Sequence, residues 1–327
     1  MQGMYKPILD MAGMEELKQA FETIGNTVMV SGCVDTQKVH FTEAISQQYK
    51  FRVIVTYDEM RARELLEDVQ FFNKNCIVYP AKDFIFYSAD VHGHQIVGQR
   101  IKCIDKILQM LNGEGSLTIV TTIDGLTDLL VPIQRYIDHT IHCQLGDKIE
   151  VEWFVKQMVC MGYERVGMVD VPGQFAIRGG IIDIYSHTDE TPVRIELWDD
   201  EIDSIRFFDV QSQRSIEKTN KYSIFPATEC LITEDEIEQG LQQIKKEAQK
   251  QIELFGNDKN YKKAEQIEHC NHIRRLLGDL ERNKDYNKYI NTFISECVSF
   301  LSYFPKEDTL FVLDEPNRID ERMNLIQ

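Results

Sequence analysis

The chain lacks the long apolar run and the cysteine pairs that would assign it to a membrane or disulfide-bonded class. No stretch of its 327 residues approaches the roughly 20 apolar residues of a membrane span. Its first residues lack the basic and then apolar pattern of a secretory signal peptide. The eight cysteines include no CxxC pair, which argues against a zinc site or a disulfide framework. These absences predict a cytoplasmic protein with reduced thiols and no membrane partner.

Positive charge is also scarce. The chain has 36 Lys and Arg residues against 53 Asp and Glu residues, a formal net charge of −17. This balance argues against tight, non-specific nucleic-acid binding by the chain as a whole, although a local basic patch can still bind an acidic partner. The apolar and charged fractions are those of an ordinary globular protein, and the length is sufficient for two or three hydrophobic cores.

Residues 30–42 resemble a phosphate-binding loop that has lost its chemistry. A working loop reads G-x-x-x-x-G-K-[ST] between a strand and a helix. Here Gly32 and Lys38 keep two of the required positions, but Gln37 replaces the second glycine and Val39 replaces the hydroxyl. A Cβ at Gln37 obstructs the close approach of phosphate, and Val39 cannot hold Mg²⁺. The pattern therefore predicts a structural relic of a nucleotide site.

The first part of the chain alternates between strand and helix patterns. This rhythm predicts an α/β fold in which a parallel sheet is covered by helices on both faces. A loop is expected from Pro80 to His94. The expected strands are Val28–Ser31, Phe51–Thr56, Asn75–Tyr79 and Leu117–Thr122, and the expected helices are Glu15–Ile24, Val39–Gln48, Met60–Phe71 and Gly98–Leu111.

The pattern changes at about residue 123. Short alternating strands at Ile181–Tyr185, Val193–Trp198 and Asp203–Asp209 predict an antiparallel meander, with one helix at Trp153–Met161. Residues 123–213 are therefore expected to form a small α+β domain inserted into the α/β framework.

The last third is expected to be mainly helical before it returns to the sheet. Thr233 and Glu236 have the spacing of a capping box, which predicts a helix that begins there. The predicted borders are 1–122 for the α/β lobe, 123–213 for the inserted domain, 214–308 for a helical subdomain, and 309–327 for a final strand and the start of a helix. Because the chain stops on that helix, we expect it to be part of a longer protein.

The strand that ends in Asp314 and Glu315 resembles a Walker B element. In P-loop NTPases the Asp of this element holds Mg²⁺ and a neighbouring Glu positions water. Together with the loop at residues 32–39, this strand is similar to part of a RecA-like helicase lobe and would complete its sheet. Since the loop lacks a metal-holding hydroxyl, we expect these carboxylates to pair locally instead.

The inserted domain carries the most specific resemblance. Gly162–Arg165, Pro172–Ile184 and Val193–Asp209 closely resemble the bacterial transcription-repair coupling factors (Mfd). The segment Asp209–Ser215 favours that family over its relative, the excision-repair protein UvrB. The similarity covers essentially the whole chain.

This resemblance implies a non-catalytic adaptor. In the family, the corresponding region combines a RecA-like lobe, an inserted domain that binds UvrA, and a helical subdomain, and it recruits UvrA to stalled RNA polymerase. RNA polymerase and DNA are bound through other domains, and ATP and Mg²⁺ belong to a motor beyond residue 327. The chain itself is thus expected to have no catalytic residue, no cofactor and no metal.

The family pattern also implies which residues contact UvrA. Arg165 and Arg178 match two arginines of the UvrB pattern, whereas the middle arginine is Ala176 here. Phe175 is expected to be the apolar anchor. Arginine suits this role because its planar fork can pair with carboxylates in a bidentate manner.

Arg194 and Arg206 alternate with apolar residues, so we expect them on the exposed face of the meander, where they extend the patch. The alternative for Arg165 and Arg178 is ion pairing within the domain, with Asp183, Glu196 or Asp199 as partners.

Two other functions stay open. The region could act as an autoinhibitory clamp, because in the family it packs against a distant C-terminal domain that hides the UvrA surface. It could also be a residual ATP- or DNA-binding helicase lobe, against which Gln37 and Val39 argue.

Overall fold

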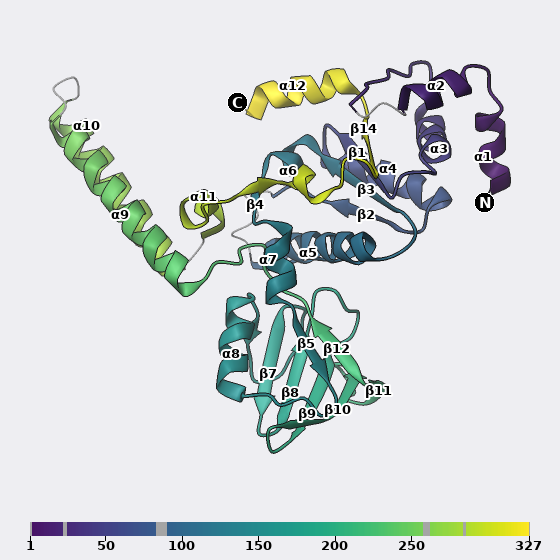
Figure 1. Cartoon of the computed structure of the whole chain (residues 1–327). Helices are drawn as coiled ribbons and strands as arrows, with labels where there is room; N and C mark the ends of the chain where they lie inside the picture. Colours follow the sequence, from purple (N-terminus) through teal and green to yellow (C-terminus); the bar gives the residue numbers. More distant parts are fainter. Residues whose placement is uncertain (1, 22–24, 83–89, 258–261, 284–285, 327) are drawn as a thin grey trace. The chain divides into compact units, whose positions relative to one another are not determined.

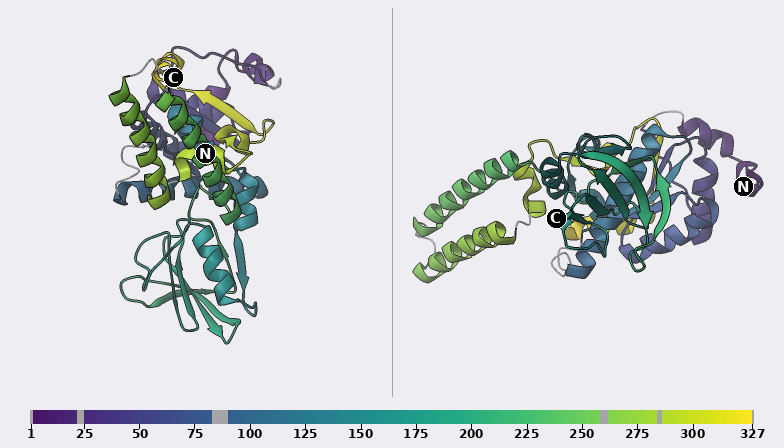
Figure 2. Two further views of the ribbon diagram at one scale, coloured as in Figure 1. Left: turned by 90° about the vertical axis from the view of Figure 1, so that its left-hand side faces the viewer. Right: turned by 90° about the horizontal axis from the view of Figure 1, so that it is seen from below.

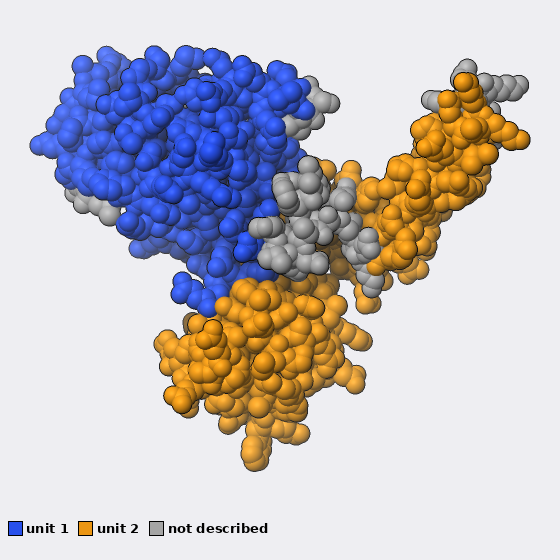
Figure 3. Space-filling model, turned by 180° about the vertical axis from the view of Figure 1, so that it is seen from behind, with its two compact units in different colours: residues 1–128, 187–190, 299–327 blue, residues 129–186, 191–298 orange. Residues whose placement is uncertain are grey.

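The computed structural model describes residues 2–21, 25–82, 90–257, 262–283 and 286–326. The chain divides into two compact units, coloured separately in Figure 3. Unit 1 comprises residues 1–128, 187–190 and 299–327, and unit 2 comprises residues 129–186 and 191–298.

Unit 1 is built on a parallel sheet with the strand order β14-β1-β3-β2 (Figure 1). The α/β class and the parallel sheet predicted from the sequence are therefore confirmed. Its elements are α1 (Gln2–Leu9), α2 (Met14–Phe21), α3 (Asp35–Ile45), β1 (Phe51–Thr56), α4 (Glu59–Phe72), β2 (Cys76–Tyr79), α5 (Asp90–Asn112), β3 (Leu117–Thr122), α6 (Ile123–Thr127), η2 (Phe300–Tyr303), β14 (Thr309–Leu313) and α12 (Pro316–Ile326).

The central strands of this sheet are buried on both sides. Every residue of β1 and of β3 is buried, as expected when helices cover both faces of a parallel sheet. Ile54 and Val120 lie in register on one face and pack against Val39 of α3 and Leu65 of α4. Helix α5 lies on the other face (Figure 1).

Two local predictions in unit 1 were wrong. The expected strand Val28–Ser31 does not form, and Met29 is 86% exposed. Three apolar residues are too short a signal to specify a strand, because strand formation depends on partners elsewhere in the chain. Helix α5 begins at Asp90, so the expected loop Pro80–His94 is helical in its last part. Residues 83–89 lie outside the described residues.

Unit 2 contains a sheet with the strand order β11-β10-β9-β8-β7-β6, in which the predicted meander is confirmed. Its elements are β4 (Leu129–Leu130), α7 (Ile133–His139), β5 (Ile141–Gln144), α8 (Val151–Cys160), β6 (Glu164–Arg165), β7 (Gln174–Arg178), β8 (Ile181–Tyr185), β9 (Val193–Trp198), β10 (Glu201–Phe208), β11 (Ser215–Thr219), β12 (Lys221–Ile224), α9 (Glu234–Asn257), α10 (Lys263–Asn283), η1 (Tyr286–Tyr289), α11 (Ile290–Phe293) and β13 (Val298–Ser299), whose last residue belongs to unit 1.

Alternation along the strands gives this sheet one apolar and one polar face. Phe175, Ile182 and Ile195 point to the same side and form a core with Phe154 and Met158 of α8. The residues between them point to the opposite side. Helix α8 therefore covers one face, and the other carries polar side chains together with a small buried cluster of Val169, Ala176 and Phe208.

Helices α9 and α10 form an antiparallel hairpin (Figures 1 and 2). The capping box predicted at the start of α9 is confirmed: the Thr233 backbone N–H donates to Glu236, and the Glu236 N–H donates to the Thr233 hydroxyl. Arg135 of α7 also donates twice to the Glu236 carboxylate, at 2.6 and 2.9 Å. These hydrogen bonds are the largest cause that lowers the pKa of Glu236, to about 2.

Candidate partner-binding face and degenerate nucleotide site

The loop that resembles a phosphate-binding motif leads into α3. Gly32 has a φ of +84°, which favours glycine, and a Cβ there would meet no atom within 4 Å. The Gln37 side chain accepts a hydrogen bond from the Val34 N–H at 3.3 Å. Val39 is buried in the core of unit 1. The two residues that break the motif thus have local structural roles, one at the start of the helix and one beneath it.

Lys38 is held by the acidic pair at the end of β14. Its Nζ donates to Asp314 at 3.1 Å and also to Glu315. Burial alone would lower the pKa of Lys38, but the hydrogen bonds to Glu315 and Asp314 raise it overall. The cation that would contact phosphate is therefore engaged by the carboxylates that would hold the metal.

Asp314 is buried and has two further partners. Arg61 of α4 donates to it through Nε at 3.0 Å, and the Thr56 hydroxyl donates to it at 3.3 Å. Arg61 also reaches Asp35 and Glu64 through its two Nη atoms. Desolvation by burial would raise the pKa of Asp314, but the hydrogen bonds from Arg61 and Lys38 outweigh it and lower the pKa.

These residues do not fit a Mg²⁺–nucleotide complex. The carboxylate that would coordinate the metal already pairs with two cations, and Val39 supplies no hydroxyl ligand. The cations and carboxylates of this network pair with one another.

Two other features are absent from the described residues. No cluster of three or more His, Cys, Asp or Glu residues there could hold a metal ion. None of the described helices combines the length and the apolar character that a membrane span requires.

The polar face of the sheet in unit 2 is built around a buried carboxylate. Asp183 of β8 lies in register with Ala176 on one side and Arg194 on the other. Arg194 pairs with both Asp183 oxygens at 2.6 and 2.9 Å and lies over the Phe208 ring, with 4.4 Å from Cζ to the ring centroid. Arg178 shares the same carboxylate at 2.6 Å. One buried charge therefore orders two arginines.

Arg206 continues this row. It lies in register with Arg194 and pairs with Glu196, which also accepts a hydrogen bond from the Ser204 hydroxyl. We call the surface formed by Arg178, Asp183, Arg194, Glu196 and Arg206 the arginine face. Ion pairing within the domain, the alternative considered from the sequence for Arg165 and Arg178, is observed for Arg178, and Arg194 and Arg206 are paired as well.

The members of the arginine face differ in how much of the guanidinium is accessible. The Arg178 side chain is 44% exposed, whereas that of Arg194 is 12% exposed. Since Arg194 is nearly enclosed and has Gln213 as a further partner, its part is structural. Arg178 is the member that can still pair with an outside group.

Arg165 is not on the arginine face. It lies on the short edge strand β6, in register with Phe175, so its side chain leaves the sheet on the side of Phe175, whereas Arg178 shares the side of Ala176. Within the described residues, the exposed Arg165 guanidinium makes no hydrogen bond or ion pair. A surface that includes both arginines must wrap around the β6 edge.

Phe175, expected to be the apolar anchor, needs correction. It is fully buried in the core against α8, because it falls on the apolar side of the alternation along β7. Its ring supports the sheet and is not available to a partner. Phe175 is close to Arg178 along the chain, but residues three positions apart on a strand point to opposite sides of the sheet.

Sequence reasoning missed Trp198, which ends β9 on the same side as Arg194 and Glu196. Its side chain is 81% exposed. The alternation along Val193–Trp198 could have found it, since it places residues 194, 196 and 198 on one side.

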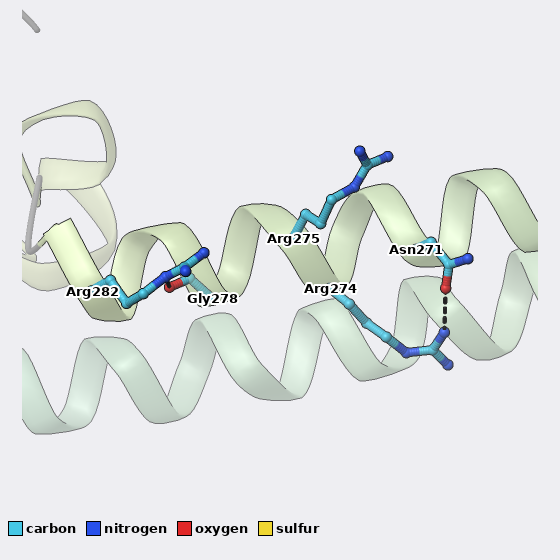
Figure 4. Close-up of a pocket in the computed structure, with 5 residues that line it drawn as sticks. All are labelled: Asn271, Arg274, Arg275, Gly278 and Arg282. Atoms are coloured by element: carbon cyan, nitrogen blue, oxygen red, sulfur yellow. Dashed lines mark hydrogen bonds between the residues drawn. The ribbon is translucent and has the colours of Figure 1, made fainter.

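A second group of arginines lies on α10, which Figure 4 shows in close-up. Arg274, Arg275 and Arg282 line a shallow hollow with Asn271 and Gly278. Their side chains diverge: Arg274 donates to Asn271, Arg282 folds back to the Gly278 carbonyl, and Arg275 points away from the neighbouring helix. Because they do not converge, these arginines form no site for a single anion.

The comparisons with known proteins agree with the resemblance found in the sequence. A family model described as the UvrB interaction domain matches residues 141–230. The transcription-repair-coupling factor of Bacillus subtilis (strain 168) is 31% identical over 304 residues, which is 91% of this chain and 25% of that protein. Those of Staphylococcus epidermidis (strain RP62A) and Staphylococcus aureus (strain USA300) are each 29% identical over 310 residues, 94% of this chain and 26% of theirs.

The chain thus spans about a quarter of the length of the curated relatives that it matches. The matched family model begins with β5 and includes the whole six-stranded sheet with its arginine face. Residues 141–230 therefore match the UvrB interaction domain family, in a chain that is similar over nine-tenths of its length to the transcription-repair-coupling factors.

Proposed function

We propose that this chain is a non-catalytic adaptor that binds UvrA through the inserted domain and so recruits it to stalled RNA polymerase in the cytoplasm. The observation that carries the proposal is the accessible Arg178, which shares a buried carboxylate with Arg194 on a domain of the UvrB interaction family. RNA polymerase and DNA are partners of other parts of the full protein in this proposal.

The arrangement favours recognition of an acidic surface. Arg178 is oriented by Asp183 but keeps donors that point to solvent, so less side-chain entropy is lost on binding than for a free arginine. Arg165 adds a second cation at the edge of the sheet, about 10 Å further back along the strand direction, given three residues at about 3.3 Å each. An acidic partner that wraps this edge would contact both.

The test is a titration of purified UvrA with the chain at two salt concentrations, using wild type and Arg165→Glu/Arg178→Glu. We expect salt-sensitive binding by wild type, because exposed charge pairs are screened, and a loss of about a hundredfold or more in the variant. Lys156→Glu/Lys221→Glu changes the net charge equally at exposed positions on α8 and β12 and is the matched control. Equal binding by the arginine variant and the control variant would contradict the proposal.

A second function uses the same face. We propose that in the full-length protein a C-terminal domain covers the arginine face and blocks UvrA until it is displaced. The incomplete charge balance of Arg178 favours such an intramolecular partner as much as an external one. Competition between an added C-terminal domain and UvrA is the expected result, and simultaneous binding of both would rule it out.

A working ATPase or DNA-remodelling lobe is the weaker alternative. The ion pairs of Lys38 and Arg61 engage both oxygens of Asp314, which supports a structural role. Mg·ATP-dependent thermal stabilisation of the chain would favour the ATPase instead.

A further inference from the structure

Trp198 is an exposed tryptophan with no structural role of its own. Its side chain is 81% exposed, although burying an indole normally contributes strongly to a core. The indole N–H makes no hydrogen bond within the described part of the chain. Trp153, the other tryptophan, is 46% exposed and lies on α8, on the opposite side of the sheet.

Strand register places Trp198 near Arg178. Arg178 lies in register with Ile181 across the β7–β8 turn, and Ile181 lies in register with Glu196 on β9. Trp198 is two residues beyond Glu196, on the same side of the sheet. Arg178 and Trp198 therefore stand at the same end of the arginine face (Figure 1 shows β7, β8 and β9 side by side).

Two glycines form the β7–β8 turn at this end of the face and add no side chain there. Gly179 has a φ of +61° and Gly180 lies against the Leu197 carbonyl, where a Cβ would be only 2.9 Å from the oxygen. The Leu197 N–H in turn donates to the Gly180 carbonyl at 2.7 Å. The turn is thus pinned to β9, and its low surface lets a partner reach the indole and the guanidinium together.

We propose that Trp198 is the apolar anchor of the UvrA-binding surface, seated beside Arg178 in an apolar pocket of UvrA that is rimmed by carboxylates. This inference rests on the proposed function and replaces the anchor role expected for the buried Phe175. Tryptophan and arginine are the residue types most enriched at the energetic centres of interfaces. Charge complementarity supports an acidic rim, because Arg178 has only a shared carboxylate to balance it.

The acidic residues of the β9–β10 turn are compatible with a partner surface that is itself acidic. Asp200 pairs with Lys148 through both oxygens, at 3.0 and 3.1 Å. Asp199, which takes a φ of 60°, is the remaining acidic residue of the turn itself. We place it at the rim of the contact, where a charge affects the association rate more than the affinity.

The affinity test compares Trp198→Ala with Trp153→Ala in the full 327-residue chain. We expect Trp198→Ala to weaken UvrA binding about tenfold or more and Trp153→Ala to change it less than about twofold. Both substitutions remove one indole, so the pair is matched, and thermal unfolding of each variant checks that the fold is kept.

A second measurement reads the indole directly. The chain is labelled with 5-hydroxytryptophan, which can be excited apart from the tryptophans of UvrA, in a Trp153→Phe background and in a Trp198→Phe background. Acrylamide quenching of the Trp198 probe is expected to fall when UvrA is added, whereas quenching of the Trp153 probe stays unchanged. Protection of Trp198 that depends on the concentration of the chain alone would instead assign the indole to a contact between two copies and overturn the inference.

The outcomes separate this inference from the function on which it rests. If wild type does not bind UvrA at all, the adaptor function fails. Suppose that wild type binds UvrA and Arg165→Glu/Arg178→Glu does not. If Trp198→Ala then binds like wild type, and acrylamide still quenches 5-hydroxytryptophan at position 198 in the complex, only the anchor role of Trp198 is wrong.

Discussion

Two clusters of arginine, lysine and carboxylate in this chain show opposite ways of using the same residue types. In unit 1, Lys38 and Arg61 converge on Asp314, and each cation has a second carboxylate as well. In unit 2, Arg178 and Arg194 share the single carboxylate of Asp183. The first network has more negative than positive groups and is closed, whereas the second has an excess of positive charge on an accessible face.

The difference shows why motif residues alone do not define a site. Lys38, Asp314 and Glu315 have the identities of nucleotide-binding residues but point at one another. Arg178 carries no motif for a small ligand, yet its charge is incompletely balanced. Accessibility and charge balance, which depend on the neighbours of each group, are what distinguish the two clusters.

The largest effect is expected for Asp183→Ala, which removes the buried carboxylate that Arg178 and Arg194 share on the arginine face. The Arg194 guanidinium would remain nearly enclosed without its counter-ion, so we expect a loss of about 3–5 kcal/mol in the free energy of unfolding. Urea denaturation measures it. Glu217→Ala, at an exposed position on β11, is the control, with an expected change within about 0.5 kcal/mol. A change that small in Asp183→Ala would mean that the arginine face is not organised by this carboxylate.

A smaller loss is expected for Asp314→Ala in the closed network. Arg61 keeps Asp35 and Glu64 as partners, and Lys38 is partly exposed, so we expect a loss of about 2–3 kcal/mol. Asp320→Ala on the exposed side of α12 is the matched control. If Asp314→Ala were as stable as this control, the network would contribute nothing to the fold.

The pH dependence of the same variant sharpens the test. Because the folded state lowers the pKa of Asp314, its stabilising contribution is complete above the unfolded value of about 3.9 and is lost as the pH falls through the folded value. The stability of wild type should therefore fall more steeply below about pH 4 than that of Asp314→Ala. Parallel curves for the two proteins would contradict the assignment.

The next effect concerns binding and not stability. The Arg165 side chain makes no hydrogen bond or ion pair within the described residues, so Arg165→Ala should change the free energy of unfolding by less than about 0.5 kcal/mol. Its affinity for UvrA should nevertheless fall about fivefold, with the loss reduced at high salt, as for a cation at the rim of an interface. Lys156→Ala on α8 is the control, and equal affinity of the two variants would remove Arg165 from the surface.

The smallest effect is expected where the broken motif is partly repaired. Gln37→Gly restores the second glycine but leaves Lys38 bound to Asp314 and Glu315. We expect a loss of about 0.5–1 kcal/mol in stability from glycine near the start of α3, and no thermal stabilisation by Mg·ATP. A nucleotide-dependent rise in the unfolding temperature would show that the network opens and that the two clusters are less different than the structure suggests.

The strands and helices with long periodic patterns were predictable because their signal is local. The expected strands at residues 51–56, 75–79 and 117–122 agree with β1, β2 and β3 to within one residue, and the meander agrees with β8, β9 and β10. The capping box at Thr233 also needed only residues three apart. The strand Val28–Ser31 failed, because its three apolar residues find no partner strand in the structure.

The candidate site was predictable in its residue types but not in its geometry. Arg178, Arg194 and Arg206 were identified from the sequence, and Asp183, one of the partners considered for Arg178, is the one observed. The sequence could not predict which arginine remains accessible, because accessibility depends on how residues of three neighbouring strands share one carboxylate.

The sequence by itself determined the class of fold, the departures from the phosphate-loop motif at Gln37 and Val39, and the similarity to the transcription-repair-coupling factors, because each of these depends on residues close together in the chain. The tertiary structure alone decided that Lys38 is bound by carboxylates 276 and 277 residues away, that Phe175 is buried, and that Trp198 and Arg178 lie at the same end of one face of the sheet. The physical reason is that burial and charge balance are set by whichever groups folding brings within a few ångströms, and their distance along the chain does not limit them.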